Sequence, residues 1–135
     1  MRNTPYAISE ASDLVAKLVA RTEENKISWN DMTELLSSSA TPETFEAELE
    51  DRVTVSISSD KSNITFAVAL KRMVGGDRLL LSVSLEHDPS FGYDLPGESE
   101  LHDNLTMLHE LARRSALNVD QNLANARQFL ERLAG

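Results

Sequence analysis

The chain contains no cysteine, and this absence excludes several kinds of chemistry. A chain without thiols has no disulfide framework, no cysteine nucleophile and no zinc site with cysteine ligands. The sequence also has no apolar stretch of signal-peptide length near its N-terminus, and no run of the roughly 20 apolar residues that a membrane span needs. We therefore expect a soluble protein, located in the cytoplasm, with no membrane partner.

Basic residues are also scarce. Lysine and arginine together number 13 against 22 aspartates and glutamates, which gives a formal net charge of −9. Affinity for phosphate groups comes mainly from lysine and arginine, so direct binding to nucleic acid is not expected. The acids are concentrated in residues 43–51 and 86–103, and the second segment contains no lysine or arginine. Three roles for this charge stay open: solubility alone, attraction of a basic protein partner, or imitation of the charge of DNA.

Side chains suited to catalysis are few. The sequence has no glycine-rich phosphate loop, no nucleophile elbow and no H-E-x-x-H motif. His102 and His109 are about 10 Å apart along a helix, too far to share one zinc ion. Glu98 lies one turn before His102, but no third ligand is within reach, so we interpret this pair as helix-surface polarity. The sequence therefore predicts no enzyme, with no catalytic residue, no metal and no cofactor.

The chain has 135 residues, enough for one continuous core, and we assign residues 1–135 to a single domain. The first predicted element is a helix over residues 5–24. Thr4 supplies an N-cap, Pro5 fits the first turn, and apolar residues recur at helical spacing. Residues 30–43 mix serine, threonine and proline, so we expect a loop there with at most one helical turn.

Strand periodicity follows. Apolar residues alternate with polar or small ones over residues 44–49, 53–58, 64–70 and 79–85. Because short turns connect these segments, we expect a four-stranded antiparallel meander. One face of this sheet is aliphatic, and the other carries small side chains with no histidine to act as a base for their hydroxyl groups. The serines expected on that outer face are Ser56, Ser58, Ser82 and Ser84.

Two further helices are expected after the sheet, one from Glu98 or Ser99 and one from Val119. Both show apolar residues at helical spacing, and Asn118 with Gln121 resembles a capping box. The three helices together supply the cover that the aliphatic face of the sheet requires. The predicted fold class is therefore α+β, in the order helix, four strands, two helices, with all three helices on one face of the sheet.

Several of these stretches occur together in a recognisable order. They are a helix that ends in KISW, the strand FEAEL, the hydrophobic meander and the C-terminal stretch ELARRSALNVDQNL. Together they resemble a recurrent type of small bacterial protein that is often found in prophage or mobile-element neighbourhoods. The resemblance implies a fold and an origin, but no activity and no catalytic residues, because the group has no established activity.

Trp29, the only tryptophan, lies between the first predicted helix and the sheet. Tryptophan is highly buried on average, so we expect its ring to close the core at this junction, with its indole N–H bonded to a carbonyl. The alternative is an exposed anchor for a partner.

Residues 88–97, DPSFGYDLPG, join the last predicted strand to the second helix. This connection is too long for a tight turn and combines two aromatic residues with acids, prolines and glycines. We predict that loop 86–103 binds a protein partner, with aromatic anchors and acidic side chains that steer association. The predicted partner-binding residues are Phe91, Tyr93, Asp88, Asp94 and Glu98. In the alternative, the loop is a lid over the core, with Phe91 and Leu95 buried.

The last predicted strand, RLLLSVSLE, lies at an edge of the meander. An uncharged apolar edge strand invites pairing with another chain, so we also predict a homodimer, formed through that edge or through the small-residue face of the sheet. The predicted interface residues are Leu80, Ser82 and Ser84.

Three functions of different classes are compatible with these features. The first, which we expect, is a non-enzymatic acidic protein-interaction module, such as an inhibitor, an immunity factor or an antitoxin, that docks on a basic partner. The second is an acidic chaperone-like dimer. The third is a small-ligand sensor or small enzyme that uses a cleft beside loop 86–103.

Overall fold

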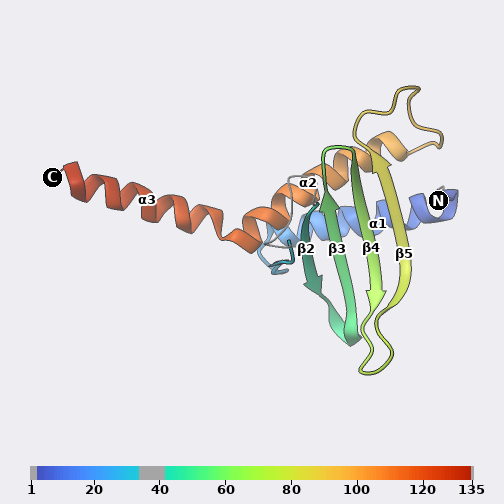
Figure 1. Ribbon diagram of the computed structural model, residues 1–135, viewed down its shortest axis with the longest axis horizontal. Coiled ribbons are helices and arrows are strands. Elements are labelled where there is room, and N and C mark those ends of the chain that lie inside the picture. Colours follow the sequence, from blue (N-terminus) through green and yellow to red (C-terminus); the bar gives the residue numbers. More distant parts are fainter. Residues whose placement is uncertain (1–2, 34–41, 135) are drawn as a thin grey trace.

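The computed structural model describes residues 3–33 and 42–134. Its elements are α1 (Pro5–Glu23), β1 (Asn30–Asp31), β2 (Glu43–Glu48), the 3₁₀ turn η1 (Glu50–Arg52), β3 (Val53–Ser59), β4 (Asn63–Leu70), β5 (Arg78–Glu86), α2 (Glu98–Leu117) and α3 (Val119–Ala134). The predicted α+β class is confirmed, with an N-terminal helix, an antiparallel sheet and two C-terminal helices (Figure 1). Each helix in the described ranges is too short or too polar to cross a membrane.

α1 begins where the sequence supplies a cap. Thr4 Oγ1 accepts a hydrogen bond from the Ala7 N–H at 3.1 Å, and Pro5 lies in the first turn, where no intrahelical N–H is required. The helix buries one stripe, formed by Ala7, Ile8, Ala11, Val15, Leu18 and Thr22. It ends at Glu23, and Asn25 then adopts φ 59°, a left-handed conformation that asparagine tolerates better than most residues.

The sheet has five strands in the order β1-β2-β3-β4-β5, and all neighbours are antiparallel. The prediction of four strands is therefore wrong. The missed strand, β1, has only two residues, and the Met32 N–H extends its contact with β2 by donating to Thr44 O at 2.8 Å. Two residues are too few to show alternation. Within the loop predicted over 30–43, residues 34–41 lie outside the described residues.

A bulge changes which side chains β5 presents. Val68 lies opposite Leu81, but Ala69 lies opposite Leu79, so Leu80 is an extra residue on β5. Ala69 belongs to the outer face because it follows the buried Val68. Leu79, predicted to face the core, is therefore exposed beside Leu80. The end of β5 presents two adjacent exposed leucines.

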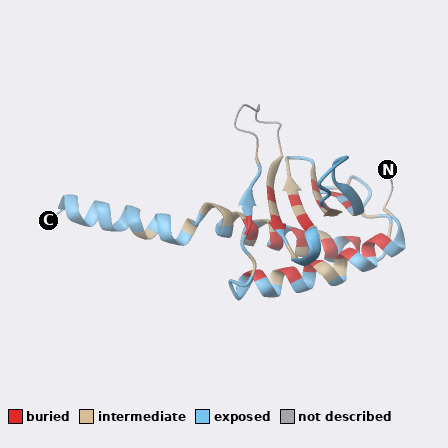
Figure 2. Ribbon diagram, turned by 90° about the horizontal axis from the view of Figure 1, so that it is seen from below, coloured by how far each residue is buried: buried red, intermediate tan, exposed pale blue. Residues whose placement is uncertain are grey.

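The core lies between the sheet and the two helices α1 and α2, which cover one face (Figure 2). Its largest fully buried side chains are Phe45, Phe66, Ile57, Ile64, Leu101, Leu105 and Leu108. They come from β2, β3, β4 and α2, in agreement with the predicted aliphatic face and the predicted helical stripe.

Trp29 is confirmed as a core residue. It is 3% exposed, and its indole N–H donates to Thr22 Oγ1 at 3.1 Å, a hydroxyl rather than the expected carbonyl. Its backbone N–H donates to Ser115 Oγ at 3.2 Å. Thr22 belongs to α1 and Ser115 to α2, so Trp29 ties both helices to the point where the chain enters the sheet.

α3 does not cover the sheet, so the prediction for this helix is wrong. It contributes no buried residue and extends away from the sheet and the other helices (Figures 1 and 2). Asn118, between α2 and α3, adopts the left-handed conformation with φ 50° and ψ 50°. The chain changes direction there, and Asn118 ends α2 in place of the capping box predicted for α3.

Candidate functional site

The connection between β5 and α2 forms a defined loop, residues 87–97. The Gly92 N–H donates to Pro89 O at 3.3 Å, and Gly92 adopts φ 78°, a conformation that glycine reaches without strain. This turn places Phe91 at its tip, where its relative exposure is 102%. The lid alternative, in which Phe91 is buried, is therefore wrong for this residue, although Leu95 packs against the core.

Tyr93, predicted as a second anchor, points inward from the same loop. Its hydroxyl donates to Glu86 O at 2.7 Å, and its ring lies 5.9 Å from the ring of His102, between centroids. Burial raises the pKa of Tyr93, and the carboxylates of Asp103, Asp88, Glu98 and Glu86 raise it further. Tyr93 thus holds the loop against β5, and the carboxylates around its hydroxyl make its surroundings negatively charged.

The three acids predicted to steer a partner lie in different environments. Asp88 and Asp94 are exposed on the loop. Glu98 is only 6% exposed, and its Oε1 accepts a hydrogen bond from the Leu95 N–H at 2.8 Å. Glu98 therefore lies in the interior of the loop, where it satisfies a backbone N–H before α2, and only the two aspartates are exposed.

A hollow of about 590 Å³ opens beside the loop, between Asn3, which precedes α1, and the end of β5. Its walls combine apolar, aromatic and acidic side chains, with no lysine or arginine among them. The lining residues are Asn3, Ser84, Leu85, Glu86, Pro89, Ser90, Phe91, Gly92, Tyr93, Asp94, Leu95 and Glu98. Four of the five predicted partner-binding residues therefore line one cavity.

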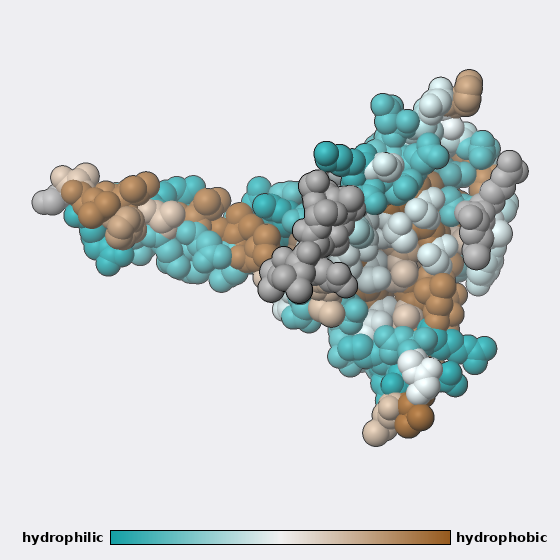
Figure 3. Space-filling model, in the orientation of Figure 1, coloured by the Kyte–Doolittle hydropathy of each residue, from teal (hydrophilic) through white to brown (hydrophobic). Residues whose placement is uncertain are grey.

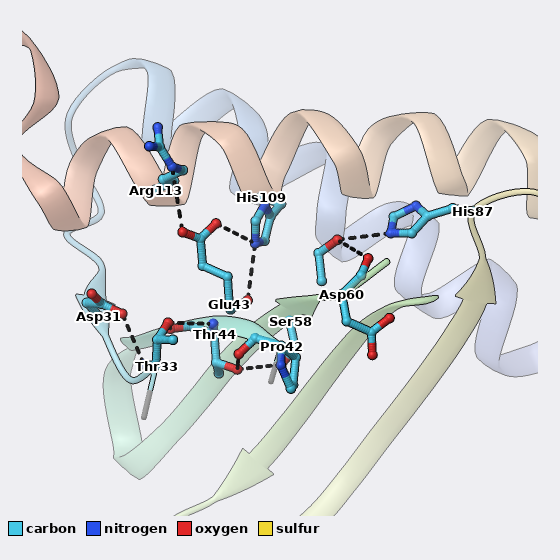
Figure 4. A network of polar contacts seen from close by, with 11 residues as sticks. Asp31, Thr33, Pro42, Glu43, Thr44, Ser58, Asp60, His87, His109 and Arg113 are labelled. Atoms are coloured by element: carbon cyan, nitrogen blue, oxygen red, sulfur yellow. Dashed lines mark hydrogen bonds and ion pairs between the residues drawn. The ribbon is translucent and has the colours of Figure 1, made fainter. Parts of the chain in front are cut away.

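A chain of polar side chains lies at the base of the loop. A hydrogen bond of 2.9 Å joins Ser59 Oγ and His87 Nε2, and another of 3.0 Å joins His87 Nδ1 and His102 Nε2. On the other side of the His102 ring, Nδ1 lies 3.7 Å from the carboxylate of Asp103. Figure 4 shows His87 reaching the end of β3. These contacts fasten the last residue of β3 to the loop and to α2.

The hydrogen bonds that link Ser59, His87 and His102 were not predicted. They correct the surface role assigned to His102, whose side chain is only 16% exposed. A serine within hydrogen-bonding distance of an imidazole is the starting arrangement for nucleophilic catalysis. However, Ser59, His87 and His102 do not line the hollow. The geometry therefore supports a fastening role.

The third histidine, His109, takes part in a separate contact near the middle of α2. His109 Nε2 lies 3.2 Å from Glu43 O and 3.6 Å from Glu43 Oε1, and its ring lies against Phe45. Arg113 Nε lies 3.7 Å from the same carboxylate (Figure 4). This network links α2 to the start of β2. Within the described ranges, no group of three or more histidine, aspartate or glutamate side chains is arranged to hold a metal ion.

The predicted dimer residues Leu80, Ser82 and Ser84 are all exposed on β5, which is an edge strand as expected. Part of this edge is already occupied. The side-chain amide of Asn3 donates to Ser84 O at 2.9 Å, and its carbonyl oxygen accepts from the Ser84 N–H at 3.3 Å. Ser84 Oγ also lies 3.0 Å from Thr65 Oγ1 on the neighbouring strand. The backbone of Ser84 is thus unavailable to an added strand, and pairing through β5 stays a prediction.

The alternation of core-facing and outer positions along the strands contained a signal for two residues that the sequence prediction missed, Ser59 and His87. Ser59 continues the core-facing positions of Val55 and Ile57, and His87 continues those of Val83 and Leu85. Polar residues at core-facing positions need partners, so each could have been assigned to a contact beneath the adjoining loop. Nothing local indicated that His102, 15 residues beyond His87, would be that partner.

Comparison of the chain with models of protein families, with curated protein sequences and with solved structures finds no match.

Proposed function

We propose that the protein is a non-enzymatic interaction module that binds a basic protein partner through loop 87–97 and the hollow beside it. Inhibitors, immunity factors and antitoxins are the kinds of protein that act in this way. The observation that carries the proposal is the position of Phe91, fully exposed at the tip of a loop that is otherwise bonded to the body.

The exposure of Phe91 matters because removing a large apolar side chain from water is favourable, so a partner that covers the ring gains binding free energy. Aromatic residues at the centre of interfaces supply much of the binding energy, especially where the partner excludes water around them. Here the backbone that presents the ring is held by the Pro89–Gly92 turn and by Tyr93. A preorganised anchor loses less conformational entropy on binding.

The charge around the anchor favours a basic partner. Asp88 and Asp94 are exposed on the loop, Glu86 lines the hollow, and no basic residue does so. A negative potential of this kind raises the association rate of a positively charged partner, and this increase becomes smaller as ionic strength rises. The raised pKa of Tyr93, caused in part by these carboxylates, is consistent with this potential.

The experiment that tests the proposal is partner capture with matched variants. The immobilised parent protein is used to isolate a stoichiometric partner, and binding kinetics are then measured. We expect Phe91→Ala to raise Kd by roughly tenfold or more, through the off-rate. Phe129→Ala is the control, because Phe129 is also exposed but lies on α3. Equal affinity of the parent and Phe91→Ala, or loss only in Phe129→Ala, would contradict the proposal.

The charges are tested separately. Asp88→Asn with Asp94→Asn should lower the on-rate and flatten its dependence on ionic strength. Asp51→Asn with Asp77→Asn changes the net charge equally, at exposed positions at the opposite end of the sheet (Figure 1). An equal effect of both pairs would mean that net charge, and not the loop, attracts the partner. Capture of a small molecule in place of a protein would favour the ligand sensor.

A further inference from the structure

α3 is a helix whose apolar side chains lack cover in the described structure. It has 16 residues and no buried side chain. Its large apolar residues are all at least half exposed, from Leu123 at 50% to Leu133 at 69%. Figure 3 shows hydrophobic residues along the part of the molecule that projects from the body. Scattered apolar residues on a surface are normal, but these belong to one element.

The spacing of these residues is that of a coiled coil. Val119, Leu123, Ala126, Leu130 and Leu133 follow one another at intervals of four, three, four and three residues. Their mean period is 3.5 residues, the period at which an apolar seam stays on one side of a supercoiled helix. In this pattern Leu123 and Leu130 occupy a positions, and the other three occupy d positions.

The helix also needs a partner for its own stability. Most helices in proteins are stabilised by packing of an apolar face, and α3, with 16 residues, is only slightly longer than the roughly 12 to 15 residues below which an isolated helix is marginal in water. α3 contains three asparagine or aspartate residues in its first seven positions, which favour helix interiors less than alanine or leucine. The contacts that hold its start are polar: Asn122 Nδ2 donates to Leu117 O at 2.7 Å, and Arg114 Nη1 lies 3.4 Å from Asp120 Oδ1.

We infer that α3 pairs with α3 of a second copy of this chain, in the antiparallel orientation, to form a two-stranded coiled coil. The inference is independent of the binding loop, because α3 lies outside both the loop and the hollow. It moves the dimer contact from the predicted β5 edge to a different element. The two bodies then lie at opposite ends of the shared coil.

Side-chain size favours the antiparallel orientation. In a parallel, in-register pair, Ala126 would face Ala126 of the partner subunit and leave a poorly filled layer. In the antiparallel pair, Leu123 faces Ala126 of the partner subunit and Val119 faces Leu130 of the partner subunit, twice each by symmetry. Every central layer then combines a larger and a smaller side chain, which fills the space between the helices more evenly.

Charge complementarity favours the same orientation. The e positions beside the seam hold Asp120 and Arg127, and flanking e and g residues select partner and orientation. In the antiparallel register given above, Asp120 lies diagonally across from Arg127 of the partner subunit, and the reciprocal pair forms on the other side. In a parallel pair, Arg127 would instead face Asn122 of the partner subunit.

The test measures the association state of the full-length chain. A coil about 24 Å long is a small interface, so dissociation is expected in the micromolar range and sedimentation should cover about 1 to 200 µM. We expect the parent chain to dimerise, and Leu123→Asp with Leu130→Asp to weaken the dimer by roughly 100-fold or more. Leu80→Lys, at the predicted β5 interface, should leave the dimer intact. Because α3 is not part of the core, circular dichroism should show a folded body in all variants.

Two results would overturn the inference. One is a parent chain that stays monomeric over the whole concentration range. The other is a dimer that survives the α3 substitutions and dissociates in Leu80→Lys.

Orientation is tested by cross-linking, which is simple because the chain has no cysteine of its own. A mixture of the Leu123→Cys and Ala126→Cys variants should form mostly mixed disulfides in an antiparallel pair. Preferential cross-linking of Ala126→Cys to itself would show a parallel pair and contradict the proposed orientation. In a second test, Arg127→Asp should weaken the dimer, and Asp120→Arg added to it should restore much of the lost affinity.

Discussion

At the scale of single residues, three aromatic side chains show how differently one class of residue can act in this molecule. Trp29 is buried and bonded to α1, Tyr93 is half-buried and bonded to the backbone of β5, and Phe91 meets only solvent. The first two stabilise the body and the loop. The third contributes nothing to either, which is why the proposed function rests on it.

Tyr93 leads to a prediction about alkaline pH. Its pKa in the folded protein is raised above 10.0, whereas in the unfolded chain it titrates near its ordinary value. Between these values the folded state binds more protons than the unfolded state, so the free energy of unfolding falls as pH rises from about 10 through the folded-state pKa. The difference in stability between the parent and Tyr93→Phe should therefore shrink in that window, as measured by urea unfolding at several pH values.

An absorbance titration checks the pKa directly. The chain has two tyrosines, so in Tyr6→Phe the tyrosinate signal comes from Tyr93 alone. A midpoint at or below pH 10 in that variant would contradict the raised pKa. At neutral pH, Tyr93→Phe should cost about 1 kcal/mol, because it removes the hydrogen bond to Glu86 O.

Residue roles were only partly predictable from the sequence. Trp29 followed from its position at a helix-to-sheet junction. Phe91 and Tyr93 are separated by one residue in the same loop, and composition cannot tell which of them turns outward. That depends on the turn that Gly92 permits and on the acceptor that Glu86 O offers, both of which are features of the folded chain.

At the scale of elements, the loop that carries Phe91 is fastened by Ser59, His87 and His102, which belong to three different parts of the fold. Because Ser59 and His102 both bond to His87, the two contacts should be coupled. In networks of this kind, the stability cost of a double mutant typically differs from the sum of the costs of the two single mutants.

A double-mutant cycle tests this coupling. Ser59→Ala and His102→Ala should each cost about 1 kcal/mol in urea unfolding, with an interaction energy of about 0.5 kcal/mol or more between them. The control cycle pairs Ser59→Ala with His109→Ala. His109 lies on the same helix but contacts Glu43 and Phe45, so those two effects should add. Additive costs in both cycles would show that the three side chains do not act as a network.

Elements with a sustained pattern were predictable, and those without one were not. The bounds of α1 and of β2 to β5, and the start of α2, agree with the sequence prediction to within one or two residues. β1 is too short to alternate, and the bulge at Leu80 has no local signature. The stripe on α3 was identified correctly, but periodicity shows only that a helix has an apolar face, and not which surface covers that face.

At the scale of the whole molecule, the chain consists of a body, formed by the sheet with α1 and α2, and a projecting helix. Since α3 contributes nothing to the core, we predict that a chain truncated after Asn118 still folds into the body formed by the sheet, α1 and α2. At low concentration its free energy of unfolding should lie within about 0.5 kcal/mol of that of the full-length chain. At high concentration the full-length chain should become the more stable of the two, because dimerisation stabilises only the folded state. Urea unfolding of both chains at two protein concentrations measures the difference, and a large loss at both concentrations would contradict the independence of the body.

The burial of Trp29 gives the molecule a built-in optical reporter. It is the only tryptophan, and its ring lies where α1, α2 and the start of the sheet meet. Its fluorescence should shift only when the body opens and stay unchanged when α3 unwinds, whereas far-ultraviolet circular dichroism sums all three helices. Recorded together during heating, the two signals separate local melting of the projecting helix from global unfolding, with no label added to the chain.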